Sequence, residues 1–164
     1  MDVITLKKIG QQLITISSSY KTGGPKKEMA LDPVLYALLS AHGAQVSRQY
    51  KAHLPNSRRI RRIDFRVGGT NPTLLEFACR PVHGASELYG PANTTELRKL
   101  CRFPSTKARL RALLLLDLCN SHLPRAALVA SYSNIGAGPG NFNRSPVQVV
   151  YVHKDHAYSF KWSP

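Results

Sequence analysis

Two strand-like segments joined by a short turn constrain the fold of this chain more than any other feature. The segment RRIDFRV at 61–67 alternates apolar and polar residues, which is the period of a half-buried strand, and its apolar residues are expected on one face: Ile63, Phe65 and Val67. The segment TLLEFACR at 73–80 is β-prone and mostly apolar, and GGTNP at 68–72 has the composition of a turn. Together they predict two neighbouring strands of one sheet.

The segments around this pair alternate between helical and strand-like patterns. Helices are predicted over 3–20, from near Lys27 or Asp32 to Gly43, over 94–102 after a helix-start box of Asn93 and Glu96, and over the leucine-rich stretch after Ser105. Strands are predicted in AQVSRQYKAHL at 44–54, in AALVASY at 126–132 and in a hairpin over 147–162 that turns at Lys154 and Asp155.

This order of elements predicts an α/β fold in which helices flank a mixed central sheet. We interpret residues 1–25 as an N-terminal helical extension and residues 26–164 as one α/β domain, which is long enough to bury a core.

The charge of the chain is strongly one-sided. Lys and Arg number 23 against 9 Asp and Glu, which gives a formal net charge of +14 at pH 7. Such a field attracts polyanions, so nucleic acid is the favoured partner. We expect DNA rather than RNA, a preference that the charge itself does not establish. Ribosome association, anionic lipid or a basic protein with no polyanionic partner would also account for the charge, and a homodimer is allowed.

The cysteines and the apolar runs favour a cytoplasmic protein with no membrane span. Cys79, Cys101 and Cys119 are odd in number and form no CxxC pair, which is typical of reduced buried thiols. The leucine run from Leu113 to Leu116 is far shorter than the roughly 20 apolar residues that cross a bilayer. The N-terminus has an acidic second residue and polar interruptions, and so makes a poor secretory signal.

Two of the scarce carboxylates fall inside the strand pair. Asp64 and Glu76 lie on adjacent predicted strands, so they can meet at one place on the sheet. Two close carboxylates repel each other unless a cation or a proton lies between them, and Mg²⁺ is commonly held by a few such oxygens. The alternative is a pair of salt bridges, from Arg62 or Arg66 to Asp64 and from Lys99 or Arg102 to Glu76.

The text around these two carboxylates resembles the PD-(D/E)xK nuclease superfamily, which has the restriction-endonuclease-like fold. The resemblance covers roughly residues 26–153 and rests on the order helix, three strands, helix, strand, with the motif residues in RRIDFRV and LLEFACR. It implies a nucleic-acid phosphodiesterase in which Asp64 and Glu76 bind Mg²⁺ or Mn²⁺, with the Phe77 carbonyl as a further ligand. It also implies accessory roles for Glu28 and Gln49.

The sequence departs from this family at one position. The motif lysine two residues after Glu76 would be residue 78, which is Ala78. Lysines placed on the following helix are a known variation in the superfamily, so Lys99 is the preferred replacement and Arg80 the second. If neither reaches the site, the chain would be an inactive nuclease-like binding module or a basic interaction protein.

A cluster of arginines precedes the first motif strand. It consists of Arg58, Arg59, Arg61 and Arg62. Arginine binds phosphate through paired N–H donors, so this cluster is predicted to hold the nucleic-acid backbone.

Overall fold

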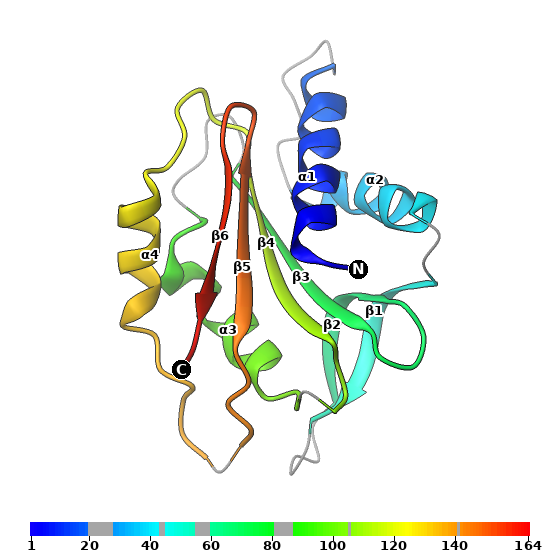
Figure 1. Cartoon of the computed structure of the whole chain (residues 1–164), viewed down its shortest axis with the longest axis vertical. Helices are drawn as coiled ribbons and strands as arrows, with labels where there is room; N and C mark the ends of the chain where they lie inside the picture. Colours follow the sequence, from blue (N-terminus) through cyan, green and yellow to red (C-terminus); the bar gives the residue numbers. More distant parts are fainter. Residues whose placement is uncertain (20–27, 43–44, 55–59, 81–86, 105, 141) are drawn as a thin grey trace.

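The protein, described from a computed structural model, is built on one six-stranded mixed sheet (Figure 1). The structure describes residues 1–19, 28–42, 45–54, 60–80, 87–104, 106–140 and 142–164. The strands lie in chain order across the sheet: β1 (Val46–His53), β2 (Ile60–Val67), β3 (Thr73–Arg80), β4 (Leu110–Asp117), β5 (Val147–His153) and β6 (Ala157–Trp162). The predicted α/β class with a mixed sheet is confirmed.

The pairing of the strands changes twice across the sheet, from antiparallel to parallel and back to antiparallel. β1, β2 and β3 form an antiparallel meander, whereas β3, β4 and β5 run parallel to one another. β6 returns antiparallel to β5, as the predicted hairpin requires. Parallel neighbours need a crossover between them, and two helical segments supply the crossovers on either side of β4.

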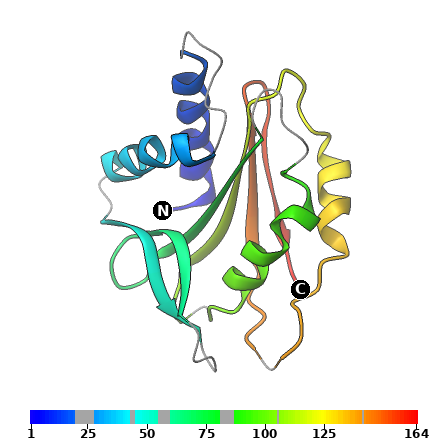
Figure 2. The ribbon, with the colours of Figure 1, turned by 180° about the vertical axis from the view of Figure 1, so that it is seen from behind.

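The helices cover the two faces of the sheet in pairs, as Figures 1 and 2 show from opposite sides. They are α1 (Val3–Ser18), α2 (Glu28–Ala41), α3 (Thr94–Cys101) and α4 (Arg125–Ser133), with a 3₁₀ turn at Gly90–Asn93 before α3. α1 and α2 close one core, and α3 and α4 close the other.

The first helix is a full member of its core. Leu6, Ile9 and Leu13 are completely buried there, together with apolar residues of β2 to β5. The boundary expected at residue 25 falls in 20–27, outside the described residues.

The prediction of a helix after Ser105 is wrong, because residues 110–117 form the strand β4. β4 lies between two parallel neighbours and is buried on both faces. Leu113 and Leu115 enter the α3–α4 core, while Leu114 and Leu116 enter the α1–α2 core. A strand buried on both faces has a continuous apolar sequence, which short-range periodicity cannot separate from a leucine-rich helix.

The prediction of a strand at 126–132 is also wrong, because this segment lies in α4. Leu128 and Tyr132 are four residues apart and are both buried, whereas the residues between them are not. This is the spacing of one face of a helix, and it places the two side chains on the same core.

In the described part of the chain, no helix combines the length and apolar character needed to cross a membrane.

Candidate functional site

The site lies at the fork where β2 separates from β3. The two strands pair over only three residues of each, from Phe65 opposite Leu75 to Val67 opposite Thr73. Just beyond this ladder, the backbone N–H of Phe77 donates a 3.0 Å hydrogen bond to Oδ2 of Asp64. A side chain thus takes over the bond that the neighbouring strand would have accepted, and the diverging strands open a gap at Asp64.

The other side of Asp64 faces a distortion in β1. Gln49 has φ +49°, the only positive value among the described non-glycine residues, and neither Gln49 nor Asp64 is paired in the β1–β2 ladder. The Gln49 amide nitrogen is 3.4 Å from Oδ1 of Asp64. A left-handed residue inside a strand is strained and turns the following side chains, so it changes which face they occupy.

The structure contradicts the expectation that the apolar residues of β2 lie on one face. Ile63, on one side of Asp64, belongs to the α3–α4 core, whereas Phe65 and Val67 belong to the α1–α2 core. The three residues therefore do not share one face, and the change of core coincides with the break in the β1–β2 ladder at Gln49 and Asp64.

Glu76 is held in the interior beside Lys99. Only 1% of Glu76 is exposed, and Lys99, on α3, places its Nζ 2.7 Å from Oε1. Buried Leu97 and Leu100 fix α3 against the sheet and so fix where Lys99 lies. Oε1 is nevertheless a buried acceptor that receives no hydrogen bond of acceptable geometry among the described groups. The Lys99 ammonium still places positive charge against this oxygen, and a carboxylate oxygen has a second lone pair that a further ligand could use.

The surroundings of Glu76 favour its neutral form. Burial, followed by repulsion from the Asp64 carboxylate, raises the pKa of Glu76 to about 9, and the Lys99 ammonium only partly opposes this shift. At neutral pH the pair of carboxylates therefore retains a proton, which a cation of higher charge could replace.

Further carboxylates line the same pocket, which has a volume of about 340 Å³. Asp64 and Glu76 are joined there by Glu87 and Glu96, so four of the nine acidic residues of a +14 chain face one cavity. Among the described residues of its lining, Lys99 is the only cationic side chain.

The loop that brings Glu87 to the pocket is held by Asn93. The Asn93 amide donates to the backbone oxygens of Glu87 at 2.8 Å and Tyr89 at 3.1 Å. Asn93 does precede α3 as predicted, but its side chain makes no capping bond to the helix. The approach of Glu87 was not predicted, because its position depends on this loop and no local sequence pattern marks it.

Arg80 does not join this pocket. Its guanidinium forms an ion pair with Asp117 at the end of β4, with a 2.8 Å bond from Nε, and also donates to the Ser121 backbone oxygen. The Tyr151 hydroxyl donates to the same Asp117 carboxylate at 2.5 Å. Arg80 thus belongs to a buried network at the ends of the parallel strands.

The remaining predicted residues are placed only in part. Glu28 begins α2, but its side chain is outside the described part of the structure, as are Arg58 and Arg59. Arg61 and Arg62 lie on β2, opposite Ala52 and Lys51 of β1. Among the described residues Asp64 forms no ion pair, so the alternative salt bridges from Arg62 and Arg66 are not present, whereas the alternative salt bridge from Lys99 to Glu76 is.

The donor set fits a hard divalent cation. Such a cation commonly takes one or two carboxylates, with water and phosphate oxygens completing its shell. Asp64 and Glu76 supply two carboxylates, and a carboxylate oxygen can contact more than one partner, so the Lys99 contact does not exclude a cation from Glu76. No set of three or more His, Cys, Asp or Glu residues with metal-binding geometry is found within the described ranges, so any metal here would depend on ligands beyond this pair.

Comparison of the chain with models of known protein families, with curated proteins and with solved structures gives no match in any of the three.

Proposed function

We propose that the protein is a divalent-metal-dependent phosphodiesterase that acts on nucleic acid. The observation that carries the proposal is the meeting of Asp64, Glu76 and Lys99 in one pocket at the fork between β2 and β3. In a protein with a formal charge of +14, gathering carboxylates around a cavity disfavours a polyanion unless a cation offsets them.

The element order supports the resemblance to the PD-(D/E)xK nucleases. α2 is followed by the β1–β2–β3 meander, then by α3, and then by β4 parallel to β3. This is the order helix, three strands, helix, strand that the resemblance implies. Asp64 and Glu76 lie on the second and third strands of that series, and Lys99 lies on the helix.

In this proposal Asp64 and Glu76 hold Mg²⁺ or Mn²⁺, and the Phe77 carbonyl is a candidate third ligand. A metal bound there would activate water and stabilise charge on a phosphate. Asp64 is oriented by the Phe77 N–H and by Gln49. Lys99 positions Glu76 and offers its remaining N–H donors to a phosphate oxygen, where positive charge stabilises the transition state.

A nuclease-like module that binds nucleic acid without cleaving it is the second candidate. It is favoured by Ala78 at the motif lysine position and by the direct contact between Lys99 and Glu76, which already gives Glu76 a cationic neighbour. In that case the Lys99–Glu76 pair joins α3 to the sheet and has no chemical role.

Cleavage of single-stranded and duplex DNA and RNA with Mn²⁺ or Mg²⁺ tests the proposal. Asp64→Asn and Glu76→Gln should each lower the rate by more than the roughly 10–100-fold typical of an outer-shell metal partner, because each removes a ligand. Binding in EDTA should be retained. Asp155→Asn is the matched control, since Asp155 is an exposed carboxylate outside the pocket. Cleavage at wild-type rates in both pocket variants would refute the proposal, and no cleavage by the wild type would favour the binding module.

A further inference from the structure

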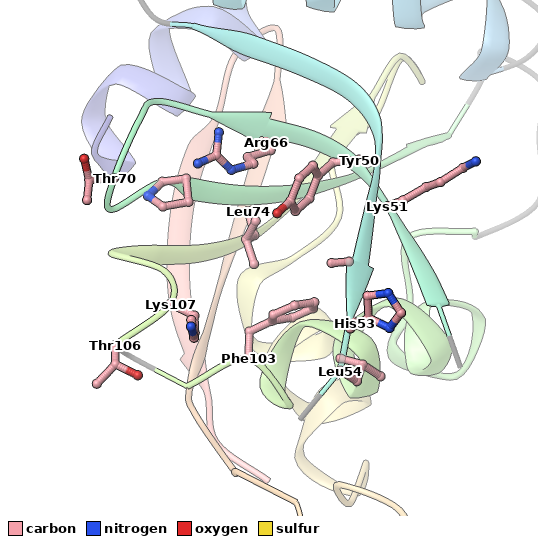
Figure 3. A pocket seen from close by; sticks show the side chains of 12 residues that line it. Tyr50, Lys51, His53, Leu54, Arg66, Thr70, Leu74, Phe103, Thr106 and Lys107 are labelled. Carbon is pink, nitrogen blue, oxygen red and sulfur yellow. The ribbon is translucent and has the colours of Figure 1, made fainter. Parts of the chain in front are cut away.

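A second and larger pocket lies on the same face of the sheet, between β1, the start of β3 and the loop after α3. Its volume is about 680 Å³, within the range of ligand pockets in proteins. Figure 3 shows Tyr50, Leu74 and Phe103 projecting into its middle, with Arg66 and Lys107 beside them, while Lys51 points away. Within the described part of the chain, no acidic residue lines this pocket.

Arg66 is a fixed cation whose charge no described carboxylate neutralises. Its guanidinium donates to the backbone oxygens of Gly68 at 3.0 Å and Gly69 at 2.5 Å, and it forms no ion pair with a described acidic residue. Because a guanidinium has five N–H donors, two carbonyl bonds leave donors for a further acceptor. Lys107 is an exposed second cation in the lining, also without a described carboxylate partner.

Two aromatic rings complete the pocket. The Arg66 guanidinium carbon lies 5.3 Å from the centre of the Tyr50 ring, which holds that ring in place from one side. Phe103 is 5% exposed and forms part of the apolar floor with Leu74. Aromatic rings beside uncompensated cations are the features that bind unpaired nucleotides, because every base has a face that can stack.

The two pockets are neighbours along β3 and α3. Leu74 lines the basic pocket and Glu76 lines the acidic one, two residues apart and therefore about 7 Å along the same face of the strand. Lys99 of α3 lines the acidic pocket, and Phe103, just after α3, lines the basic one. A ligand of more than one unit could reach both.

We propose that the basic pocket binds an unpaired nucleotide of a nucleic-acid strand that also places one of its phosphates at the acidic pocket. The substrate is therefore single-stranded or locally unpaired nucleic acid. This inference rests on the proposed function for its ligand class. The base stacks on Tyr50, and its phosphate is bound by Arg66 and Lys107. A base inside a duplex is stacked between its neighbours and would have to leave the helix to enter.

Fluorescence anisotropy in EDTA tests this proposal without requiring cleavage. The probes are a fluorescein-labelled 12-nucleotide oligothymidylate and the same strand annealed to its oligodeoxyadenylate complement. The wild type should bind the single strand at least about tenfold more tightly than the duplex, since stacking of one base typically contributes a factor of that order. Tyr50→Ala should lower single-strand affinity by about tenfold and duplex affinity much less.

A second variant separates loss of the Tyr50 ring from loss of folding, and a matched control tests a tyrosine outside the pocket. Tyr50→Leu retains apolar packing while removing the ring, and should show the same loss even if Tyr50→Ala is poorly folded. Tyr36→Ala is the control, because Tyr36 is 38% exposed on α2, across the sheet, with the Arg48 guanidinium carbon 5.7 Å from its ring centre. It should bind the single strand as the wild type does.

The outcomes separate this inference from the catalytic proposal. A strand preference that is lost in Tyr50→Leu supports it even if no metal-dependent cleavage is found. Wild-type single-strand affinity in Tyr50→Leu, equal binding of single strand and duplex, or equal losses in Tyr50→Leu and Tyr36→Ala would overturn it.

Discussion

The acidic and basic pockets occupy the same face of the sheet but differ in the sign of their charge. Four carboxylates and one lysine line the smaller pocket, whereas the larger contains arginine, lysine and histidine and no carboxylate from the described residues. In a chain with 23 Lys and Arg, a basic lining requires little special arrangement. The gathering of four of nine carboxylates does, so the acidic pocket is the more informative of the two.

The pockets also differ in the burial of their charges, although Arg66 of the basic pocket is half-buried and is held by two backbone carbonyls. Glu76 is buried against Lys99, and Asp64 is fixed by a backbone N–H, whereas His53 and Lys107 in the basic pocket are exposed. Charges in a low-dielectric interior interact much more strongly than exposed ones. Substitutions in the acidic pocket should therefore have the larger effects.

Lys99→Met gives the largest expected effect outside the metal ligands. Loss of one positioned donor typically lowers kcat by about 10²–10³-fold, and KM should change little if Lys99 acts on the transition state. Lys107→Met, in the basic pocket, should raise KM instead. Steady-state kinetics on a labelled oligonucleotide measure both constants.

Arg80→Met is the comparison variant for Lys99. Because Arg80 pairs with buried Asp117, its loss leaves an unpaired buried charge and should lower stability. If Arg80→Met remains folded but loses kcat while Lys99→Met does not, the assignment of Lys99 is wrong.

Without metal, the free energy of unfolding should depend on pH through Glu76. With the pKa of Glu76 raised to about 9, the folded chain keeps a proton that the unfolded chain has lost above its ordinary value of 4.5. The contribution of Glu76 to the free energy of unfolding is fully present below pH 4.5 and is lost as the pH rises through 9. The slope is at most about 1.4 kcal/mol per pH unit.

Urea unfolding of wild type and Glu76→Gln between pH 5 and 9 measures this slope. The wild type should lose stability with rising pH relative to the variant, because glutamine cannot titrate. Parallel curves would mean that Lys99 keeps Glu76 ionised, which would favour a structural ion pair.

The smallest expected effect belongs to the arginines of β2. Arg61→Ser with Arg62→Ser should reduce the slope of log affinity against log salt by about 0.9 for each phosphate of duplex DNA that is no longer neutralised. Folding should change little, because Arg62 is exposed and Arg61 half-buried, and neither forms an ion pair with a described acidic residue. Arg125→Ser, on the exposed surface of α4, is the control. An unchanged slope in the double variant would place the phosphate track elsewhere on the protein.

The comparison of pockets also shows what the sequence could predict. Asp64 and Glu76 could be placed together because a five-residue turn joins their strands, of which local alternation identifies the first and a β-prone apolar composition the second. The structure brings Lys99 beside Glu76, where the helix position of the resemblance would put it. The place of Glu87 in the pocket could not be predicted, because it depends on a loop whose backbone is hydrogen-bonded to the Asn93 side chain.

The basic pocket was not predicted at all, since Tyr50, Leu74 and Phe103 come from separate segments and carry no shared motif. The errors at β4 and α4 have a common physical cause. Burial on both faces made β4 resemble a helix, and an apolar run of small and branched residues made α4 resemble a strand. In both cases tertiary packing decided the structure, which local patterns cannot register.

The central claim is that Asp64 and Glu76 together bind a divalent cation, and thermal melting with Mn²⁺ tests it most directly. A ligand that binds only the folded state stabilises it by about 2.7 kcal/mol at a hundredfold excess over Kd. Millimolar Mn²⁺ should raise the Tm of the wild type and of Asp155→Asn, at matched ionic strength, and should leave the Tm of Glu76→Gln almost unchanged. Melting curves of the wild type that are identical with and without Mn²⁺, or an equal rise in Glu76→Gln, would contradict the claim.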